Sequence, residues 1–127
     1  MQPLRWGMVG GGEGAFIGAV HRMAARLNGR YQLLAAAPSS DAERAKRSGI
    51  AMNLAPDRIY PTLQAMIAGE SKRDDGVEVV SVVTPNALHY SQCKALLEAG
   101  VDVICDKPLT TTLADAKQLV QLAKQQH

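Results

Sequence analysis

The sequence is poor in the features that mark secreted, membrane-spanning and metal-binding proteins. Its two cysteines, Cys93 and Cys105, fit reduced thiols better than a disulfide framework, and neither has the spacing of a metal ligand. No apolar run approaches the roughly 20 residues that span a bilayer. The first residues also lack the apolar stretch of a signal peptide. We therefore expect a cytoplasmic protein with no metal site and no membrane partner.

Aromatic residues and excess charge are scarce as well. The formal net charge is +2, with acidic and basic residues interspersed, and the chain has three Tyr, one Phe and one Trp. This net charge is too small to predict nucleic-acid binding, and few aromatic rings are available to stack on bases. With 127 residues, 46% of them hydrophobic, the chain is long enough for one globular domain with a real core.

What the sequence does contain is a regular alternation of strand-like and helix-like segments. Strands are expected at 4–9, 31–37, 59–60 (a stub), 77–83 and 101–105, and the 77–83 segment has five valines in seven residues. Helices are expected at 18–28, 42–48, 61–68, 87–99 and 113–125. Such alternation predicts a doubly wound α/β fold with a parallel sheet. We expect the Rossmann strand order 3-2-1-4-5, with 77–83 beside 4–9 at the centre.

Three local expectations accompany this pattern. The first helix should face the core with four residues at helical spacing, Ile17, Val20, Ala24 and Leu27. Gly49 should end the second helix, because glycine is a common helix terminator. Pro61 should be the first residue of the third helix, where its missing N–H costs nothing.

A glycine-rich segment follows the first strand directly. Gly10 can turn the chain tightly, and Gly12 has no Cβ to keep a pyrophosphate away from the backbone. Dinucleotide-binding loops carry the pattern Gly-x-Gly-x-x-Gly. Ala15 stands at the position of its third glycine, while Gly18 fits that position only if the loop carries three extra residues. Strand, glycines and helix together offer free backbone N–H groups to an anion. Taken alone, the segment fits an ordinary glycine turn equally well.

Three more polar turns follow strand ends, and in a parallel sheet they share one edge with the glycines. Ser39-Ser40 stands where the adenosine ribose of a dinucleotide would be gripped, although helix capping also accounts for it. Thr84-Pro85-Asn86, followed by His89, lies at the end of the central strand. Asp106-Lys107-Pro108 leaves the last strand. Taken alone, the Thr84-Pro85-Asn86 segment is more simply interpreted as a loop that contains a proline, and the Asp106-Lys107-Pro108 segment as a solvent-exposed turn.

Together the motifs resemble one family, the glucose–fructose oxidoreductase/inositol dehydrogenase/rhizopine-catabolism (Gfo/Idh/MocA) oxidoreductases, over essentially the whole chain. The matching stretches are Val9-Gly10-Gly11-Gly12 through Ile17-Gly18 with His21, Thr84-Pro85-Asn86 with His89, and Cys105-Asp106-Lys107-Pro108-Leu109. The resemblance implies an oxidoreductase that uses NAD or NADP on a hydroxyl carbon of a sugar, inositol or related polyol.

The resemblance also implies roles for single residues. The pyrophosphate would be held by Gly10, Gly12, Ala15, Phe16, Ile17 and Gly18. The cofactor would also be flanked by Thr84, Pro85, Asn86 and His89. Asp106 would hydrogen-bond near the nicotinamide, although the family more often has Glu there. Lys107 would be the catalytic residue, touching the nicotinamide ribose and stabilising the oxyanion that develops on the substrate hydroxyl.

The choice between NAD and NADP depends on the turn after the second strand. The family's NAD users often have Asp where this chain has Ser39. A carboxylate there would bind the ribose 2′-OH and repel a 2′-phosphate. With Ser39, Ser40 and, on the adjoining helix, Arg44, a 2′-phosphate is admissible, so we expect NAD or NADP with a slight preference for NADP.

In the family, a sixth strand and a second α/β domain follow the segment that ends here at residue 127. That domain supplies the acid/base groups and most of the substrate pocket, so residues 1–127 are expected to be the NAD(P)-binding domain, inactive alone. The 101–105 strand would then be an edge, open to pairing with a second copy. Two alternatives are a self-standing dinucleotide-binding sensor without catalysis and a domain of this fold that binds coenzyme A.

Overall fold

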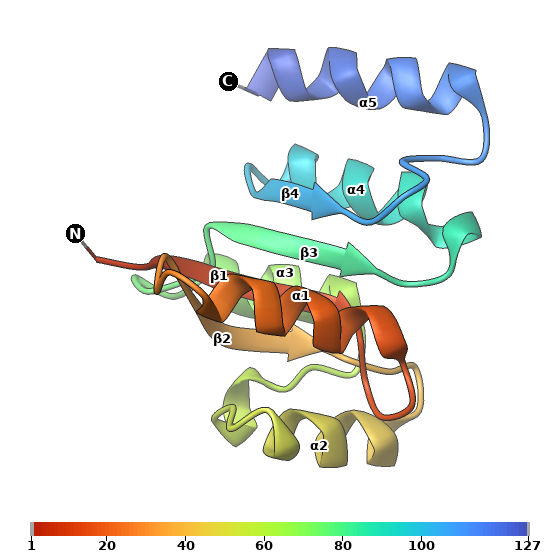
Figure 1. Ribbon diagram of the computed structural model, residues 1–127. Helices are drawn as coiled ribbons and strands as arrows, with labels where there is room; N and C mark the ends of the chain where they lie inside the picture. Colours follow the sequence, from red (N-terminus) through yellow and green to blue (C-terminus); the bar gives the residue numbers. More distant parts are fainter. Residues whose placement is uncertain (1, 127) are drawn as a thin grey trace.

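The predicted alternation of strands and helices runs through residues 2–126, the part of the chain that the computed structural model describes (Figure 1). In order, the elements are β1 (Leu4–Gly10), α1 (Phe16–Arg26), β2 (Tyr31–Ala37), α2 (Ala42–Ala51), the 3₁₀ turn η1 (Pro56–Arg58), α3 (Leu63–Ser71), β3 (Val79–Val83), the 3₁₀ turn η2 (Asn86–Leu88), α4 (His89–Glu98), β4 (Asp102–Cys105) and α5 (Leu113–Gln126).

The four strands form one parallel sheet in the order β2-β1-β3-β4. β3 lies beside β1, with Ser81 opposite Met8, and β4 lies beside β3. The predicted stub is a single parallel bridge from Ile59 to Ala36 on β2. With that bridge counted as the third of five strands, the predicted order 3-2-1-4-5 is confirmed.

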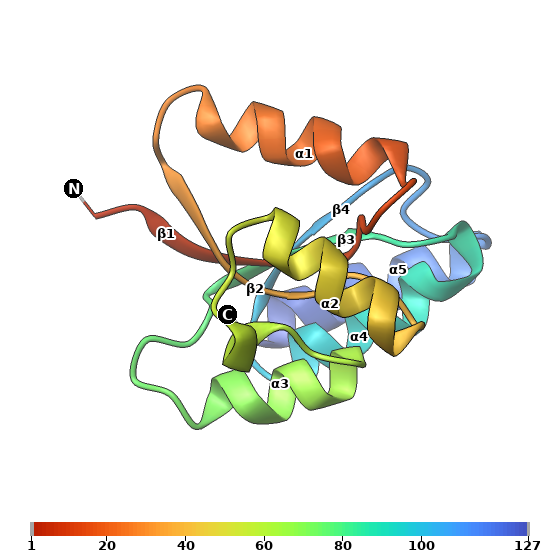
Figure 2. The same cartoon turned by 90° about the horizontal axis from the view of Figure 1, so that it is seen from below.

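Helices cover the two faces of the sheet unequally. α1 lies on one face, while α3 and α4 lie on the other, and α5 packs against α4 (Figure 2). The alternation of side chains along each strand supplies a core to both faces. Val80, Val82 and Leu96 are buried on the α3 and α4 side, and Trp6 and Met8 on the α1 side.

The predicted inward face of α1 is confirmed only in part. Val20 is 38% exposed and Leu27 is 86% exposed, whereas Gly18 is the buried residue of this helix. Ile17, Val20 and Ala24 line a hollow between α1 and the sheet, beside Trp6, and the closest contact of the helix is made by Gly18 with the loop before it. Ile17 keeps the predicted orientation and packs against the core of the α1 face.

The predicted ends of two other helices were also wrong. α2 continues past Gly49, because this glycine serves close packing: a Cβ there would lie 2.5 Å from the side chain of Ile59. α3 begins at Leu63 and not at Pro61. Thr62 is its N-cap, and the Thr62 hydroxyl accepts a 3.0 Å hydrogen bond from a backbone N–H of the first turn.

A buried ion pair that no motif indicated joins η1 to α3. The side chains of Arg58 and Glu70 are 6% and 4% exposed and meet at 2.5 Å and 3.2 Å. The Tyr60 hydroxyl donates to the same carboxylate at 2.8 Å, and burial together with this carboxylate raises the pKa of Tyr60 to about 12. The Val77 backbone N–H donates to Glu70 at 3.1 Å, so one carboxylate joins three segments.

Replacing Glu70 with Ala should lower the free energy of unfolding by about 3–5 kcal/mol, because it removes the main partner of a buried guanidinium. The matched control is Asp57→Asn, at a carboxylate that is 72% exposed and 3.4 Å from Arg73; it should cost at most about 1 kcal/mol. Urea unfolding of the three proteins measures both values. Equal losses in the two variants would contradict a structural role for the buried pair.

Candidate functional site

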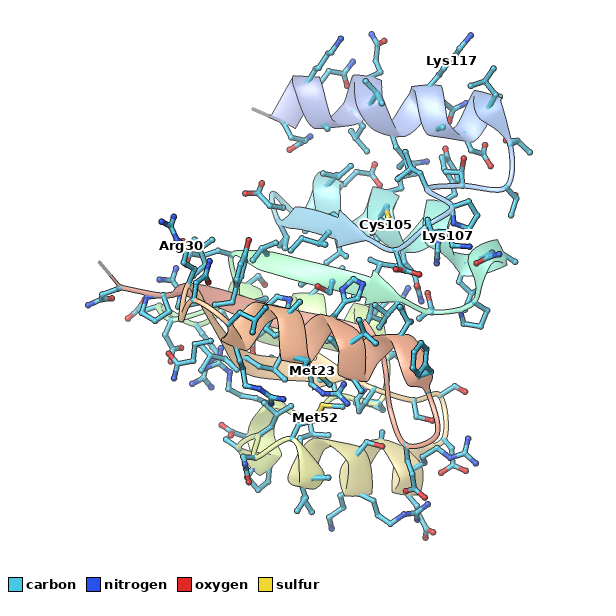
Figure 3. All side chains as sticks on the ribbon, viewed as in Figure 1. Met23, Arg30, Met52, Cys105, Lys107 and Lys117 are labelled. Atoms are coloured by element: carbon cyan, nitrogen blue, oxygen red, sulfur yellow. The ribbon has the colours of Figure 1, made fainter. Side chains whose placement is uncertain are left out.

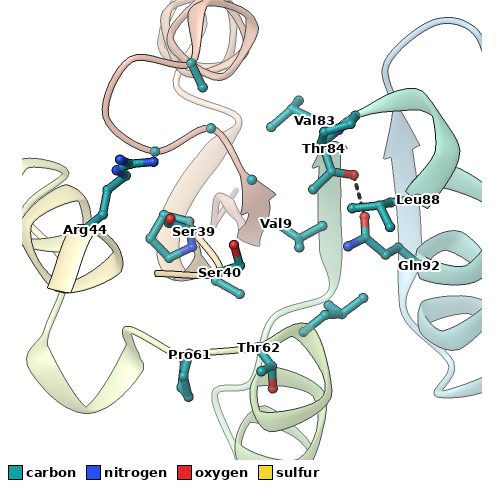
Figure 4. Close-up of a pocket in the computed structure, with 18 of the residues that line it drawn as sticks. Val9, Ser39, Ser40, Arg44, Pro61, Thr62, Val83, Thr84, Leu88 and Gln92 are labelled. Atoms are coloured by element: carbon teal, nitrogen blue, oxygen red, sulfur yellow. Dashed lines mark hydrogen bonds between the residues drawn. The ribbon is translucent and has the colours of Figure 1, made fainter. Parts of the chain in front are cut away.

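A cleft of about 450 Å³ lies at the carboxyl ends of the strands (Figure 4). Its walls come from the glycine loop after β1, the turn after β2, the start of α3 and the turn after β3. Three of the four predicted turns therefore meet in one cavity. The fourth, after β4, lies outside it.

The glycine loop presents the N-terminus of α1 to the cleft. Ala15 precedes the helix with an extended backbone and no side-chain cap, and the first helical turn has no acidic residue. The first N–H groups are thus left for a ligand, and the helix dipole favours an anion there. Glu13, the acidic residue of the loop, is instead held 3.3 Å from Arg47.

Gly18 brings α1 close to this loop. A Cβ at Gly18 would lie 2.4 Å from the Cα of Gly11, a distance that real Cβ atoms do not show. The helix can therefore pack backbone against backbone at this point only with glycine. Gly18 therefore corresponds to the third glycine of the Gly-x-Gly-x-x-Gly pattern, in a loop that is three residues longer than the pattern has.

The turn after β2 forms the opposite wall. The Gly12 N–H donates to the Pro38 carbonyl at 3.1 Å, and a Cβ on Gly12 would lie 2.6 Å from that oxygen. The glycine loop and this turn are thereby held against each other. Ser39, Ser40 and Arg44 line the cleft as expected. Helix capping falls to Asp41, whose side chain accepts a hydrogen bond from the Arg44 N–H at 3.0 Å, while the Ser39 hydroxyl accepts one from the Asp41 N–H at 3.1 Å in the turn before α2.

Thr84 and Pro85 line the third wall, together with residues that the motifs did not include. The Thr84 hydroxyl donates to the amide oxygen of Gln92 at 2.5 Å (Figure 4). The additional lining residues are Leu88 and Gln92 beside Thr84 and, at the start of α3, Pro61, Thr62, Leu63 and Gln64. Their positions follow from the packing of α3 and α4, so the sequence carried no signal beyond their nearness to predicted turns.

His89 lies beneath the cleft and does not line it. The residue is 1% exposed, with Nδ1 2.7 Å from the Pro108 carbonyl oxygen and Nε2 2.9 Å from the Thr84 carbonyl oxygen. Its ring therefore links the turn after β3 to the turn after β4. This arrangement gives His89 a positioning role between the two turns.

Lys107 is exposed just after the carboxyl end of β4 (Figure 3), and it does not line the cleft. Beside it, Asp106 Oδ1 lies 3.3 Å from His21 Nε2, which joins this turn to α1. Among the other predicted residues, Asn86 is exposed at the start of η2, and Phe16, at the start of α1, is 80% exposed. Of the residues expected at the pyrophosphate, Gly10, Gly12 and Ala15 line the cleft together with the ribose-side turn. The remaining three, Phe16, Ile17 and Gly18, do not line it, and neither does Lys107.

The two cysteines are free thiols, as the sequence predicted. Cys93 is buried on α4 and Cys105 is half-buried at the end of β4, and both line one apolar hollow beside α5. The hydrogen bond from the Cys93 thiol lowers the pKa of Cys105 to about 7, and the same bond together with burial raises the pKa of Cys93.

Within residues 2–126, no helix is long and apolar enough to cross a membrane. In the same range, His, Cys, Asp and Glu side chains form no group of three or more that could hold a metal ion.

A parallel sheet, a cleft at its carboxyl edge and an uncapped helix N-terminus on a glycine loop define a dinucleotide-binding Rossmann domain. Comparison with known families agrees. The model of the oxidoreductase family with an NAD-binding Rossmann fold (Gfo/Idh/MocA) matches residues 4–127, and the chain belongs to this family. The resemblance drawn from the three motifs is confirmed.

Several relatives share most of this chain. The uncharacterized oxidoreductase YfiI of Bacillus subtilis is 51% identical over 124 residues, which are 97% of this chain and 32% of that protein. D-xylose 1-dehydrogenase (NADP(+)) of Hypocrea jecorina is 34% identical over 96 residues, 75% of this chain and 23% of the relative. An inositol dehydrogenase homolog from Azotobacter vinelandii, solved with NADH and myo-inositol, superposes with a TM-score of 0.96 at 41% identity.

That superposition covers 98% of this chain and 33% of the solved chain. The chain therefore spans about a third of the length of the relatives that match it over nearly all its residues.

Iodoacetamide should alkylate Cys105 with a rate midpoint near pH 7, because its thiolate is lost only as the pH falls through that value. Peptide mass spectrometry across a pH series measures the rate at each cysteine. In Cys93→Ala the hydrogen-bond donor is absent, so the midpoint should rise toward the ordinary value of about 8.5. An unchanged midpoint in this variant would show that Cys93 is not the cause.

Proposed function

We propose that residues 1–127 are the NAD(P)-binding domain of a dehydrogenase that acts on a CH–OH carbon of a sugar, inositol or related polyol. The observation that carries the cofactor assignment is the uncapped N-terminus of α1, facing a cleft between the glycine loop and Ser39-Ser40. The substrate class is supported by the D-xylose dehydrogenase and by the myo-inositol complex of the inositol dehydrogenase homolog.

The residues of this chain divide between binding and chemistry. The N–H groups at the start of α1 hold the pyrophosphate, while Ser39, Ser40 and Arg44 face the adenosine ribose. The nicotinamide, when bound, supplies hydride transfer. Lys107, at the end of β4, stabilises negative charge on the substrate oxygen. Since Lys107 is exposed and outside the cleft, we propose that other parts of the whole protein complete its site and supply the proton acceptor.

Thermal melting with added ligands tests the binding function. NAD and NADP should each raise the melting temperature of residues 1–127 in a saturable way, because a ligand that binds only the folded state stabilises it. Coenzyme A should not. A larger shift with coenzyme A than with either dinucleotide would favour the alternative ligand and contradict the proposal.

A turnover assay addresses the enzymatic part. Residues 1–127 should form no NAD(P)H with sugars or polyols, whereas the whole protein should, and Lys107→Ala should abolish that activity. Binding without turnover in the whole protein would favour the sensor. Turnover by residues 1–127 that Lys107→Ala removes would show a compact enzyme instead.

We also propose a slight preference for NADP over NAD, on the basis of Ser39, Ser40 and Arg44 in the cleft. Ser39→Asp should weaken NADP roughly tenfold more than NAD, because the new carboxylate would face the 2′-phosphate. Titration calorimetry measures both affinities. Asn28→Asp adds the same charge in the exposed turn before β2 and should leave the ratio unchanged. Equal effects of Ser39→Asp on both cofactors would refute this role.

We propose, finally, that β4 pairs with a second copy when residues 1–127 stand by themselves. Among residues 2–126 no further strand follows β4 at this edge of the sheet, and Ile104 is 37% exposed there. Light scattering should detect a dimer whose population falls in Ile104→Lys, because a charged edge discourages pairing. A wild-type chain that stays monomeric at high concentration would defeat the proposal.

A further inference from the structure

The wall formed by Thr84 and Gln92 carries a polar group that the proposed binding scheme does not yet use. Thr84 follows β3, and Gln92 lies one turn into α4. The Thr84 hydroxyl donates to the Gln92 amide oxygen at 2.5 Å, so that oxygen is occupied and the amide is held in place. Among the described residues the amide nitrogen has no hydrogen-bond partner, and Figure 4 shows it directed from α4 toward Val9, into the cleft.

Several of the side chains that line the cleft with this amide are apolar. Val9, Leu63 and Val83 line it and are 4%, 4% and 6% exposed, and Leu88 borders it beside Gln92. A sugar ring here would leave its hydroxyl groups without partners, which is costly. A flat heteroaromatic base has apolar faces for these side chains and ring nitrogens that accept hydrogen bonds. The wall therefore fits a base better than it fits a sugar.

The position within the cleft decides which half of a dinucleotide lies there. The N-terminus of α1, where the pyrophosphate is proposed to bind, follows β1, which has β2 on one side and β3, then β4, on the other. Gln92 lines the same cavity as Ser39 and Ser40, whereas Asp106 and Lys107 do not line it. The base facing Gln92 is therefore the one attached to the ribose at Ser39-Ser40, which is adenine.

We propose that Gln92, oriented by Thr84, is a specificity-determining residue for the adenine base and that its amide NH₂ donates to a ring nitrogen of adenine. This inference depends on the proposed dinucleotide-binding function. Because the amide oxygen is bound by Thr84, the side chain turns its NH₂ group, a donor, toward the base. Adenine, which has three unprotonated ring nitrogens besides the one that joins the ribose, matches that donor.

Two substitutions distinguish the contribution of the hydrogen-bond donor of Gln92 from that of its side-chain shape. Gln92→Met has nearly the same length without a donor, and Gln92→Glu keeps an acceptor for Thr84 but cannot donate. Each should raise the dissociation constant for NAD about two- to tenfold, the value of one hydrogen bond, with Glu the weaker binder. Gln121→Met makes the same change on the exposed face of α5 and is the matched control.

ADP-ribose, which has the adenosine half but no nicotinamide, shows which end of the cofactor Gln92 contacts. Titration calorimetry with both ligands should give the same loss for NAD and for ADP-ribose in Gln92→Met. A loss seen only with NAD would place the contact at the nicotinamide end, and unchanged affinity for both would remove the contact; either overturns the inference. Failure of the wild-type chain to bind NAD, NADP or ADP-ribose would contradict the proposed function itself.

Discussion

The contact of α1 with the loop before it, backbone against backbone, is the constraint on which the cleft depends. At Gly18 the helix approaches Gly11 so closely that no Cβ fits, and at Gly12 the loop approaches the Pro38 carbonyl in the same way. These two contacts fix the start of α1 relative to both neighbouring strands. A side chain at Gly18 or Gly12 would push the helix or the turn away and separate the anion-binding N–H groups from Ser39-Ser40.

Two histidines connect the turn after β4 to neighbouring elements. The two ring nitrogens of His89 lie 2.7 Å and 2.9 Å from the carbonyl oxygens of Pro108 and Thr84, and His21 on α1 lies 3.3 Å from Asp106. Lys107 lies between Asp106 and Pro108, so the residues on both sides of it are held by side chains from other elements. The surface that carries Lys107 is thus joined to the cleft wall through buried contacts and not only through the chain.

Stability and binding are built at opposite edges of the sheet. The Arg58–Glu70 pair lies near the start of β3, where the Val77 backbone N–H donates to Glu70, whereas the cleft lies where the strands end. A parallel sheet allows this division, because ligands bind in the crevice beyond the carboxyl ends of its strands. The exposed stripe on α1, including Phe16 and Leu27, belongs to neither region.

The sequence by itself determined the strands, their order and the turns that meet at the cleft. Valine-rich and alanine-rich runs, glycines after a strand and prolines in turns act locally, so their signals are readable from neighbouring residues. Only the tertiary structure decided which glycine touches which backbone, why Leu27 faces outward, and that His89 is buried beneath the cleft. It also decided that Gln92 holds Thr84 and that Glu70 meets Arg58. The sequence gives the chemical type of each side chain. Which residue it contacts depends on how whole helices and strands pack, and local sequence patterns do not contain that information.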